Sequence, residues 1–210
     1  PSQAPRKVVF NDDETEHDEK IEQEVPAEVE HRWESFNLKP ELVKGIYSAG
    51  FETPSYIQKK AIPVIIERKD LRAQAQSGTG KTGAFVVGVL QRIDAAMHVP
   101  QCLVLAPTRE IAAQNAGKFR EIGAYMGVAV CLLAGGTSVT ADIKALSKNP
   151  HVVVGTPGRI GHMLKGGHLR TEDIQLFVLD EADEMLKAEF EDEVREIYMK
   201  LSNPRLQTLL

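Results

Sequence analysis

The chain has 210 residues, 42% of them apolar and 26% charged, which suits one good-sized globular domain. No run of about 18 apolar residues and no secretory signal pattern occurs in it, so the sequence predicts neither a membrane span nor export. The chain has a net charge of −5. Residues 1–30 contain three Lys or Arg and ten Asp or Glu, a net charge of −7, so the other 180 residues have a net charge of +2. A near-neutral core neither supports nor excludes nucleic acid, because binding needs only a local basic face.

The first segment in chain order is an acidic tail. Residues 11–30 are poor in large apolar side chains, so they cannot bury enough surface to become ordered. We therefore expect residues 1–32 to be a disordered tail, with a short surface helix as the alternative. The folded domain is expected to cover residues 33–210.

Short apolar segments then alternate with longer helical ones. A helix should open after Thr53-Pro54 and kink or end at Pro63. Strands are predicted at 71–75, 101–105, 128–133, 151–154, 176–179 and 207–210, and helices at 80–95, 109–125, 138–147, from 157, and from the end of the strand at 176–179 to about 201. This alternation predicts βαβ units, hence an α/β fold with a mostly parallel sheet and helices on both faces.

A glycine-rich loop joins the strand at 71–75 to the next helix. Its residues are Gln76, Ser77, Gly78, Thr79, Gly80, Lys81 and Thr82, preceded by Ala75 where the usual phosphate-loop pattern has its first Gly. The glycines let backbone N–H groups turn toward phosphate oxygens, and the helix N-terminus favours the same anion. Lys81 can reach the terminal phosphates, and the Thr82 hydroxyl can bind Mg²⁺. Chance glycines in a turn are the alternative.

An acidic box, Asp180-Glu181-Ala182-Asp183, follows the strand at 176–179. In an open parallel sheet, ligands collect at the carboxyl ends of the strands, so the box should meet the phosphate loop there. Asp180 could then bind Mg²⁺ opposite Thr82, and Glu181 could activate the water that attacks the γ-phosphate. Taken alone, Asp183 is better explained as a first-turn acid that complements the helix dipole.

These two motifs together resemble the DEAD-box RNA helicases, specifically their N-terminal RecA-like domain, a P-loop NTPase fold. The similarity covers about residues 33–210, and residues 73–77 are similar to the translation initiation factor 4A type. The resemblance implies ATP and Mg²⁺ as cofactors and RNA-dependent ATP hydrolysis coupled to unwinding. It gives catalytic roles to Lys81, Asp180, Glu181 and Asp183, the last coupling the site to a Ser-Ala-Thr motif.

The segment Gly50–Gln58 resembles the family's Q motif. That resemblance implies that Gln58 reads the adenine edge and that Phe51 stacks on the ring. Without the family, Gln58 would be an ordinary helix residue and Phe51 a core residue.

Three further loops match the family's RNA-contact motifs. They hold Pro107, Thr108 and Arg109, then Gly135 and Gly136, and then Thr156, Gly158 and Arg159. By themselves, Gly135-Gly136 would be a turn and Thr156-Pro157 a helix start. Hydroxyl, backbone N–H and Arg donors at strand ends suit phosphate contacts, which imply little sequence preference and strong salt dependence.

Two departures from the family pattern stand out. Arg72 occupies a position that is usually apolar, which suggests an edge position, a salt bridge or altered packing. The sequence also stops at Leu210, before the Ser-Ala-Thr motif and the second RecA-like domain. Since an arginine finger from that second domain accelerates hydrolysis by about 10³–10⁵, we expect the chain as given to bind nucleotide weakly and hydrolyse it barely.

Two other functions share some of these features. An ATP-gated RNA clamp or scaffold in a larger ribonucleoprotein complex would carry the same motifs. A GTPase or small-molecule kinase would share the phosphate loop, but the chain has no Asn-Lys-x-Asp guanine motif. Cys102 and Cys131 are expected to be reduced core thiols, so we expect an intracellular protein, cytoplasmic or nuclear, with protein partners that the sequence does not identify.

Overall fold

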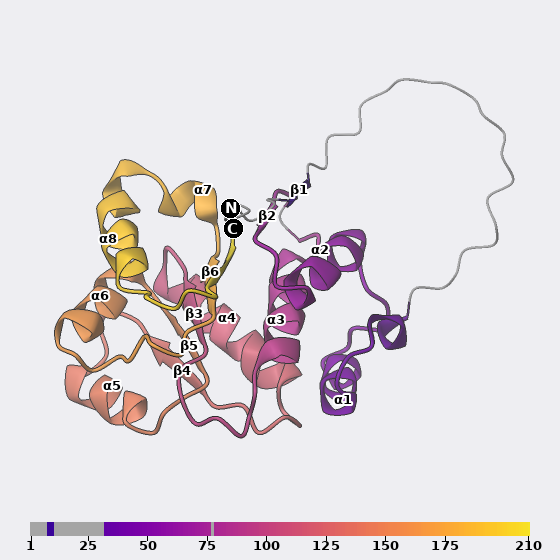
Figure 1. Cartoon of the computed structure of the whole chain (residues 1–210), viewed down its shortest axis with the longest axis horizontal. Coiled ribbons are helices and arrows are strands. Elements are labelled where there is room, and N and C mark those ends of the chain that lie inside the picture. The colour runs from indigo at the N-terminus through magenta and orange to yellow at the C-terminus, as the bar shows by residue number, and fades with distance from the viewer. Residues whose placement is uncertain (1–7, 11–31, 77) are drawn as a thin grey trace, which may run out of the picture.

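The computed structural model describes residues 8–10, 32–76 and 78–210 (Figure 1). Of the tail expected to be disordered, residues 1–32, all but residues 8–10 and 32 lie outside the described residues. Within the described ranges, no helix is both long and apolar enough to cross a membrane.

The described strands form one seven-stranded sheet in which every pair is parallel, in the order β1-β2-β7-β6-β3-β5-β4. The strands are β1 (Val8–Phe10), β2 (Leu71–Ala73), β3 (Cys102–Leu105), β4 (Val130–Leu133), β5 (Val152–Gly155), β6 (Leu176–Leu179) and β7 (Gln207–Leu209). All residues of β3, β5 and β6 are buried, as expected for central strands covered on both faces. The predicted parallel α/β fold is confirmed.

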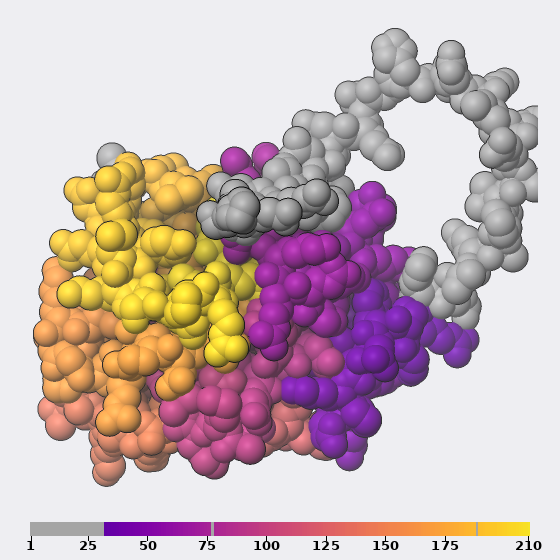
Figure 2. All heavy atoms as spheres, in the orientation of Figure 1, coloured from indigo at the N-terminus to yellow at the C-terminus, as the bar shows by residue number. Residues whose placement is uncertain are grey.

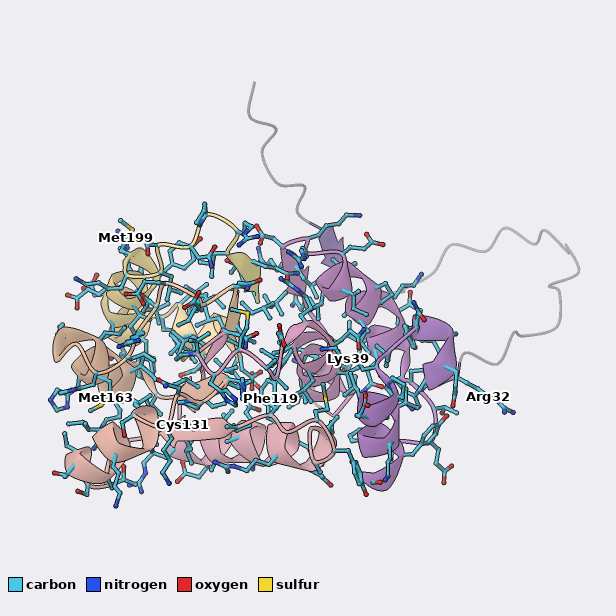
Figure 3. All side chains as sticks on the ribbon, turned by 60° about the horizontal axis from the view of Figure 1, so that its bottom comes forward. Arg32, Lys39, Phe119, Cys131, Met163 and Met199 are labelled. Carbon is cyan, nitrogen blue, oxygen red and sulfur yellow. The ribbon has the colours of Figure 1, made fainter. Side chains whose placement is uncertain are left out.

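Helices cover both faces of this sheet (Figure 1). They are η1 (Trp33–Phe36), α1 (Pro40–Ser48), α2 (Tyr56–Ile66), α3 (Lys81–Arg92), α4 (Arg109–Ile122), α5 (Val139–Leu146), α6 (Pro157–Lys165), α7 (Ala182–Met185) and α8 (Ala188–Met199). Buried residues of α1–α4 form one core cluster with alternate strand residues, such as Cys102 and Val104. The intervening residues, such as Leu103, join a second cluster with α5–α8. Phe119 belongs to the first cluster, and Cys131 and Met163 belong to the second (Figure 3).

The C-terminal strand β7 fills the gap between β2 and β6. The buried Gln207 side chain donates from Nε2 to the carbonyls of Ile65 and Lys69 and accepts from Arg92. The Thr208 N–H donates to Asp70 Oδ1 at 2.8 Å. In Figure 2, yellow C-terminal residues lie beside purple residues of the segment that precedes β2. These bonds fix β7 next to the strand that carries the phosphate loop.

Three predicted elements differ from the structure. The long helix expected up to residue 201 is broken into α7 and α8, because Lys187 is extended (φ −70°, ψ 155°) and begins a new helix. Helix α2, expected to kink or end at Pro63, does not end there but runs three residues further, to Ile66. Val8–Phe10, inside the segment expected to be a tail, pairs with β2 as an edge strand.

Candidate nucleotide and RNA sites

The parallel sheet brings every strand-end loop to one edge. The loops after β2 and β6 carry the phosphate loop and the acidic box, with β7 between these strands. The loops after β3, β5 and β4 carry the three motifs expected to contact RNA, and these strands are consecutive in the sheet. The edge is therefore divided into two neighbouring parts, one for each group of motifs.

The phosphate loop lies between β2 and α3, as predicted. Gly80 is the N-cap of α3 and has φ +100°, a left-handed conformation that glycine adopts without strain. The Thr79 hydroxyl donates to the Gln76 carbonyl at 2.8 Å, which closes the turn. Lys81 and Thr82 are half-buried in the first turn of α3. The predicted residue Ser77 lies outside the described residues.

Gln58 connects helix α2 to this loop. It is 2% exposed, and its Oε1 accepts from the Ser55 N–H at 2.8 Å, which forms a capping box at the start of α2. Its Nε2 donates to the Gly80 carbonyl at 3.2 Å. A Cβ on Gly83 would lie 2.6 Å from Nε2, so a larger residue at this position would push the Gln58 amide away from its present place. The structure therefore uses Gln58 to brace the phosphate loop.

Phe51 is close to the same place. Its Cε1 would be 3.7 Å from a Cβ on Gly83, and the Lys118 ammonium lies 5.4 Å from the ring centroid. The Phe51 carbonyl accepts from Trp33 Nε1 at 2.9 Å, which anchors this segment to η1. Phe51 and Gln58, predicted from the resemblance alone, thus meet at the first turn of α3.

The acidic box begins where β6 ends. The Asp180 N–H donates to the Leu105 carbonyl at 3.0 Å. Its carboxylate accepts from the Glu181 N–H at Oδ1 (3.1 Å) and from Asn115 Nδ2 at Oδ2 (2.7 Å). Glu181 has φ +51° and is the N-cap of α7, and both Glu181 and Asp183 are exposed. Asn115 was not among the predicted site residues, although a polar residue on the apolar face of the helix at 109–122 is a signal of such a role.

A cavity of about 410 Å³ joins the two motifs. Its polar lining includes Arg72, Gln74, Lys81, Asp180, Glu181 and Asp183, and residues of α2 and α3 add apolar walls. Arg72 is exposed at this cavity, and no salt bridge of the described residues includes it. In the part of the chain that the structure describes, no group of three or more His, Cys, Asp or Glu is arranged to hold a metal ion.

The predicted RNA-contact loops touch one another. A Cβ on Gly136 would lie 2.3 Å from Arg109 Nη1, so the guanidinium lies directly over that glycine. Arg159 forms a salt bridge with Asp142, and its Nη2 donates to the Thr137 carbonyl at 3.0 Å. Arg109 is exposed, whereas the Arg159 side chain is only 11% exposed. Arg159 therefore braces the loop after β4.

The remaining predicted residues of these loops lie at helix starts or in the turn. Thr108 is the N-cap of α4 and accepts from the Ile111 N–H at 3.2 Å, and Pro107 precedes it. Thr156 is the N-cap of α6, and Gly158 is exposed in its first turn. Gly135 lies in the loop after β4, beside Gly136. The N-termini of α4 and α6 thus both open toward this edge, which favours anions.

Comparison with known proteins agrees with this arrangement. The sequence profile of the DEAD/DEAH box helicases matches residues 55–210. The chain is 58% identical over 171 residues to the ATP-dependent RNA helicase eIF4A of Encephalitozoon cuniculi, covering 81% of this chain and 40% of that protein. The eIF4A of Schizosaccharomyces pombe is 48% identical over 87% of this chain and 46% of its own length. The chain thus spans less than half the length of these relatives.

Two solved structures share the fold. Saccharomyces cerevisiae Dbp5 bound to RNA and ADP BeF3 superposes with a TM-score of 0.78 at 32% identity, over 86% of this chain and 46% of Dbp5. A DEAD box protein from Methanococcus jannaschii gives a TM-score of 0.77 at 35% identity, over 85% of this chain and 49% of that one. With the profile match over most of its length, the chain belongs to the DEAD/DEAH box helicase family.

Proposed function

We propose that residues 33–210 are the ATP-binding half of an ATP-dependent RNA helicase. One observation carries the proposal: Lys81 of the phosphate loop and Asp180 and Glu181 of the acidic box line one cavity. The loops after the three neighbouring strands present donors suited to an RNA backbone. The names of the eIF4A relatives and the RNA bound to Dbp5 support the same function.

The cavity suits the phosphates of Mg-ATP. Lys81 supplies a positive charge, and the start of α3 supplies backbone N–H groups. The Thr82 hydroxyl and the Asp180 carboxylate are oxygen donors of the kind Mg²⁺ takes, and phosphate oxygens and water complete such a site, so a larger cluster of protein ligands is not required. Bound Mg²⁺ would neutralise charge on the phosphates.

Hydrolysis needs a group that orients water near the γ-phosphate. We assign this to Glu181, which is exposed at the cavity next to Asp180. Asp183, also exposed at the cavity, is assigned the contact with the second RecA-like domain.

Base selection is assigned to Gln58 and Phe51. In the structure, Gln58 Nε2 makes one bond to Gly80, which leaves its second N–H for a ligand acceptor. Phe51 supplies an aromatic ring beside the same turn of α3. Because Gln58 also contacts the phosphate loop, adenine binding and loop position would be linked through this one amide.

RNA is assigned to the edge formed by the loops after β3, β5 and β4. Arg109 and Thr108 are exposed there and can contact phosphates directly. Arg159 acts mainly by holding the loop after β4 through Asp142 and Thr137. Backbone-directed contacts of this kind give little sequence preference and weaken steeply with salt.

The cellular role follows the relatives named eIF4A. We propose that the protein acts on mRNA inside the cell, in translation initiation or mRNA processing, with protein partners and a second RecA-like domain completing both clefts. The high identity to the eIF4A of E. cuniculi supports translation initiation as the first choice.

RNA-stimulated phosphate release by the protein that carries this domain tests the proposal. The wild-type protein should release phosphate faster when single-stranded RNA is added. The Glu181→Gln variant should still bind ATP but lose turnover, and Lys81→Ala should lose ATP binding. Turnover that survives in Glu181→Gln would show that the assigned water-activating role is wrong.

A further inference from the structure

Asn115 is a buried polar residue on an apolar helix face. It is 2% exposed, and the other buried positions of α4 are Ala112, Ala116, Phe119 and Ile122, all in the first core cluster. An amide buried without a partner costs about 1–3 kcal/mol, so such a residue is expected to have a bonding partner. Its Nδ2 donates to Asp180 Oδ2 at 2.7 Å, a short bond to a carboxylate.

This bond completes the fixation of Asp180. The Asp180 backbone N–H is held by the Leu105 carbonyl of β3, and Oδ1 accepts from the Glu181 N–H. With Oδ2 held by Asn115, the carboxylate plane cannot turn without breaking one of these bonds. Each oxygen still has a second acceptor site, so the bonds orient the carboxylate and leave it able to bind a cation or its water.

We propose that Asn115 is the positioning residue that holds the Asp180 carboxylate in the orientation required for Mg²⁺. The inference rests on the proposed Mg-ATP site and adds to it a residue outside the phosphate loop and the acidic box. Hydrogen-bonded partners of metal-binding carboxylates contribute about 10–100-fold to metal affinity. Asn115 acts through Asp180 and does not itself contact the cation.

The test measures how Mg²⁺ concentration changes the binding of a fluorescent ATP analogue to this 210-residue chain. Asn115→Leu removes the donor and keeps a similar side-chain volume. Asn115→Ala removes the donor without any risk of overpacking. Gln114→Leu makes the corresponding amide-to-leucine change at an exposed position of the same helix and serves as the matched control.

We expect both Asn115 variants to raise, by about 10-fold or more, the Mg²⁺ concentration that gives half of the maximal change in analogue binding. Binding of the analogue without Mg²⁺ should stay within about twofold of wild type, and Gln114→Leu should match wild type throughout. If both Asn115 variants lower the thermal stability but leave the Mg²⁺ midpoint unchanged, Asn115 has only a structural role and the inference is wrong. If Mg²⁺ does not affect binding to the wild-type chain, the proposed Mg-ATP site itself fails.

Discussion

Replacing Gln58 by Glu separates the two hydrogen bonds of this side chain. The change keeps an acceptor for the Ser55 N–H but removes the donor that faces the Gly80 carbonyl at 3.2 Å. When ionised, the new carboxylate would place an oxygen against that carbonyl, at a site only 2% exposed. Losing one partner of a buried bond costs about 1–3 kcal/mol, and ~2 kcal/mol lowers the melting temperature of a domain of this size by about 4–8 °C.

The penalty should depend on pH. Burial raises the pKa of a carboxyl above its usual value of about 4.3, so the folded variant is protonated at a pH where the unfolded chain is ionised. The protonated form can donate to the Gly80 carbonyl and restores the bond. The stabilisation by this bond is therefore present at low pH and is lost as the pH rises through the pKa of the folded variant. Because the loss begins near the unfolded pKa of about 4.3, we expect the melting temperature of Gln58→Glu to be closer to that of wild type near pH 5 than near pH 8.

Thermal unfolding followed by circular dichroism at both pH values, with wild type as the reference at each, measures this difference. Gln58→Ala is the matched control, because it loses both bonds and adds no titratable group. Its melting temperature should therefore lie below that of wild type by a similar amount at the two pH values. If Gln58→Glu lowered the melting temperature by the same amount near pH 5 and near pH 8, the proposed contact with Gly80 would be refuted.

Three further predictions concern the core. In Gly45→Ala, the new Cβ would lie 1.8 Å from the Ile122 carbonyl oxygen, so α1 must move away from α4. We expect the free energy of unfolding, measured by urea denaturation, to fall by about 3 kcal/mol or more. A variant as stable as wild type would contradict this packing. Burial lowers the pKa of His151 below 6.5. As the pH drops below about 6.5, the unfolded chain therefore takes up a proton before the folded chain does, and the free energy of unfolding falls. His151→Asn should make this fall between pH 7 and pH 5 smaller, and an unchanged dependence of stability on pH would contradict the prediction. Burial raises the pKa of Cys102 and raises that of Cys131 to about 11, so a thiol reagent near pH 8 should modify neither in the folded chain and both after denaturation.

The motif loops could be predicted because local chemistry marks them. Pro107, Gly136 and Pro157 each end an apolar strand segment and open a turn or helix, so the strand ends were evident from the sequence. Once the sheet is parallel, those ends must meet at one edge. The position of the cavity therefore followed from the pattern of strands and helices.

Other features depend on contacts between distant segments and carry no local signal. Val8–Phe10 becomes a strand only because β2 is available to pair with it. Nothing at Lys187 resembles a helix breaker, yet it is the N-cap of α8. The bonds of Gln58 to Gly80 and of Asn115 to Asp180 join residues 22 and 65 positions apart, so their partners are known only from the fold.

We propose that this domain binds Mg-ATP at the cavity between the phosphate loop and the acidic box. The most direct measurement is displacement of a fluorescent ATP analogue from this chain by unlabelled ATP or GTP in the presence of Mg²⁺. We expect ATP to displace it at lower concentration than GTP. We also expect Lys81→Ala, which removes the positive charge of Lys81 from the cavity, to bind the analogue far more weakly. Displacement by GTP at lower concentration than ATP, or unchanged binding by Lys81→Ala, would contradict this proposal.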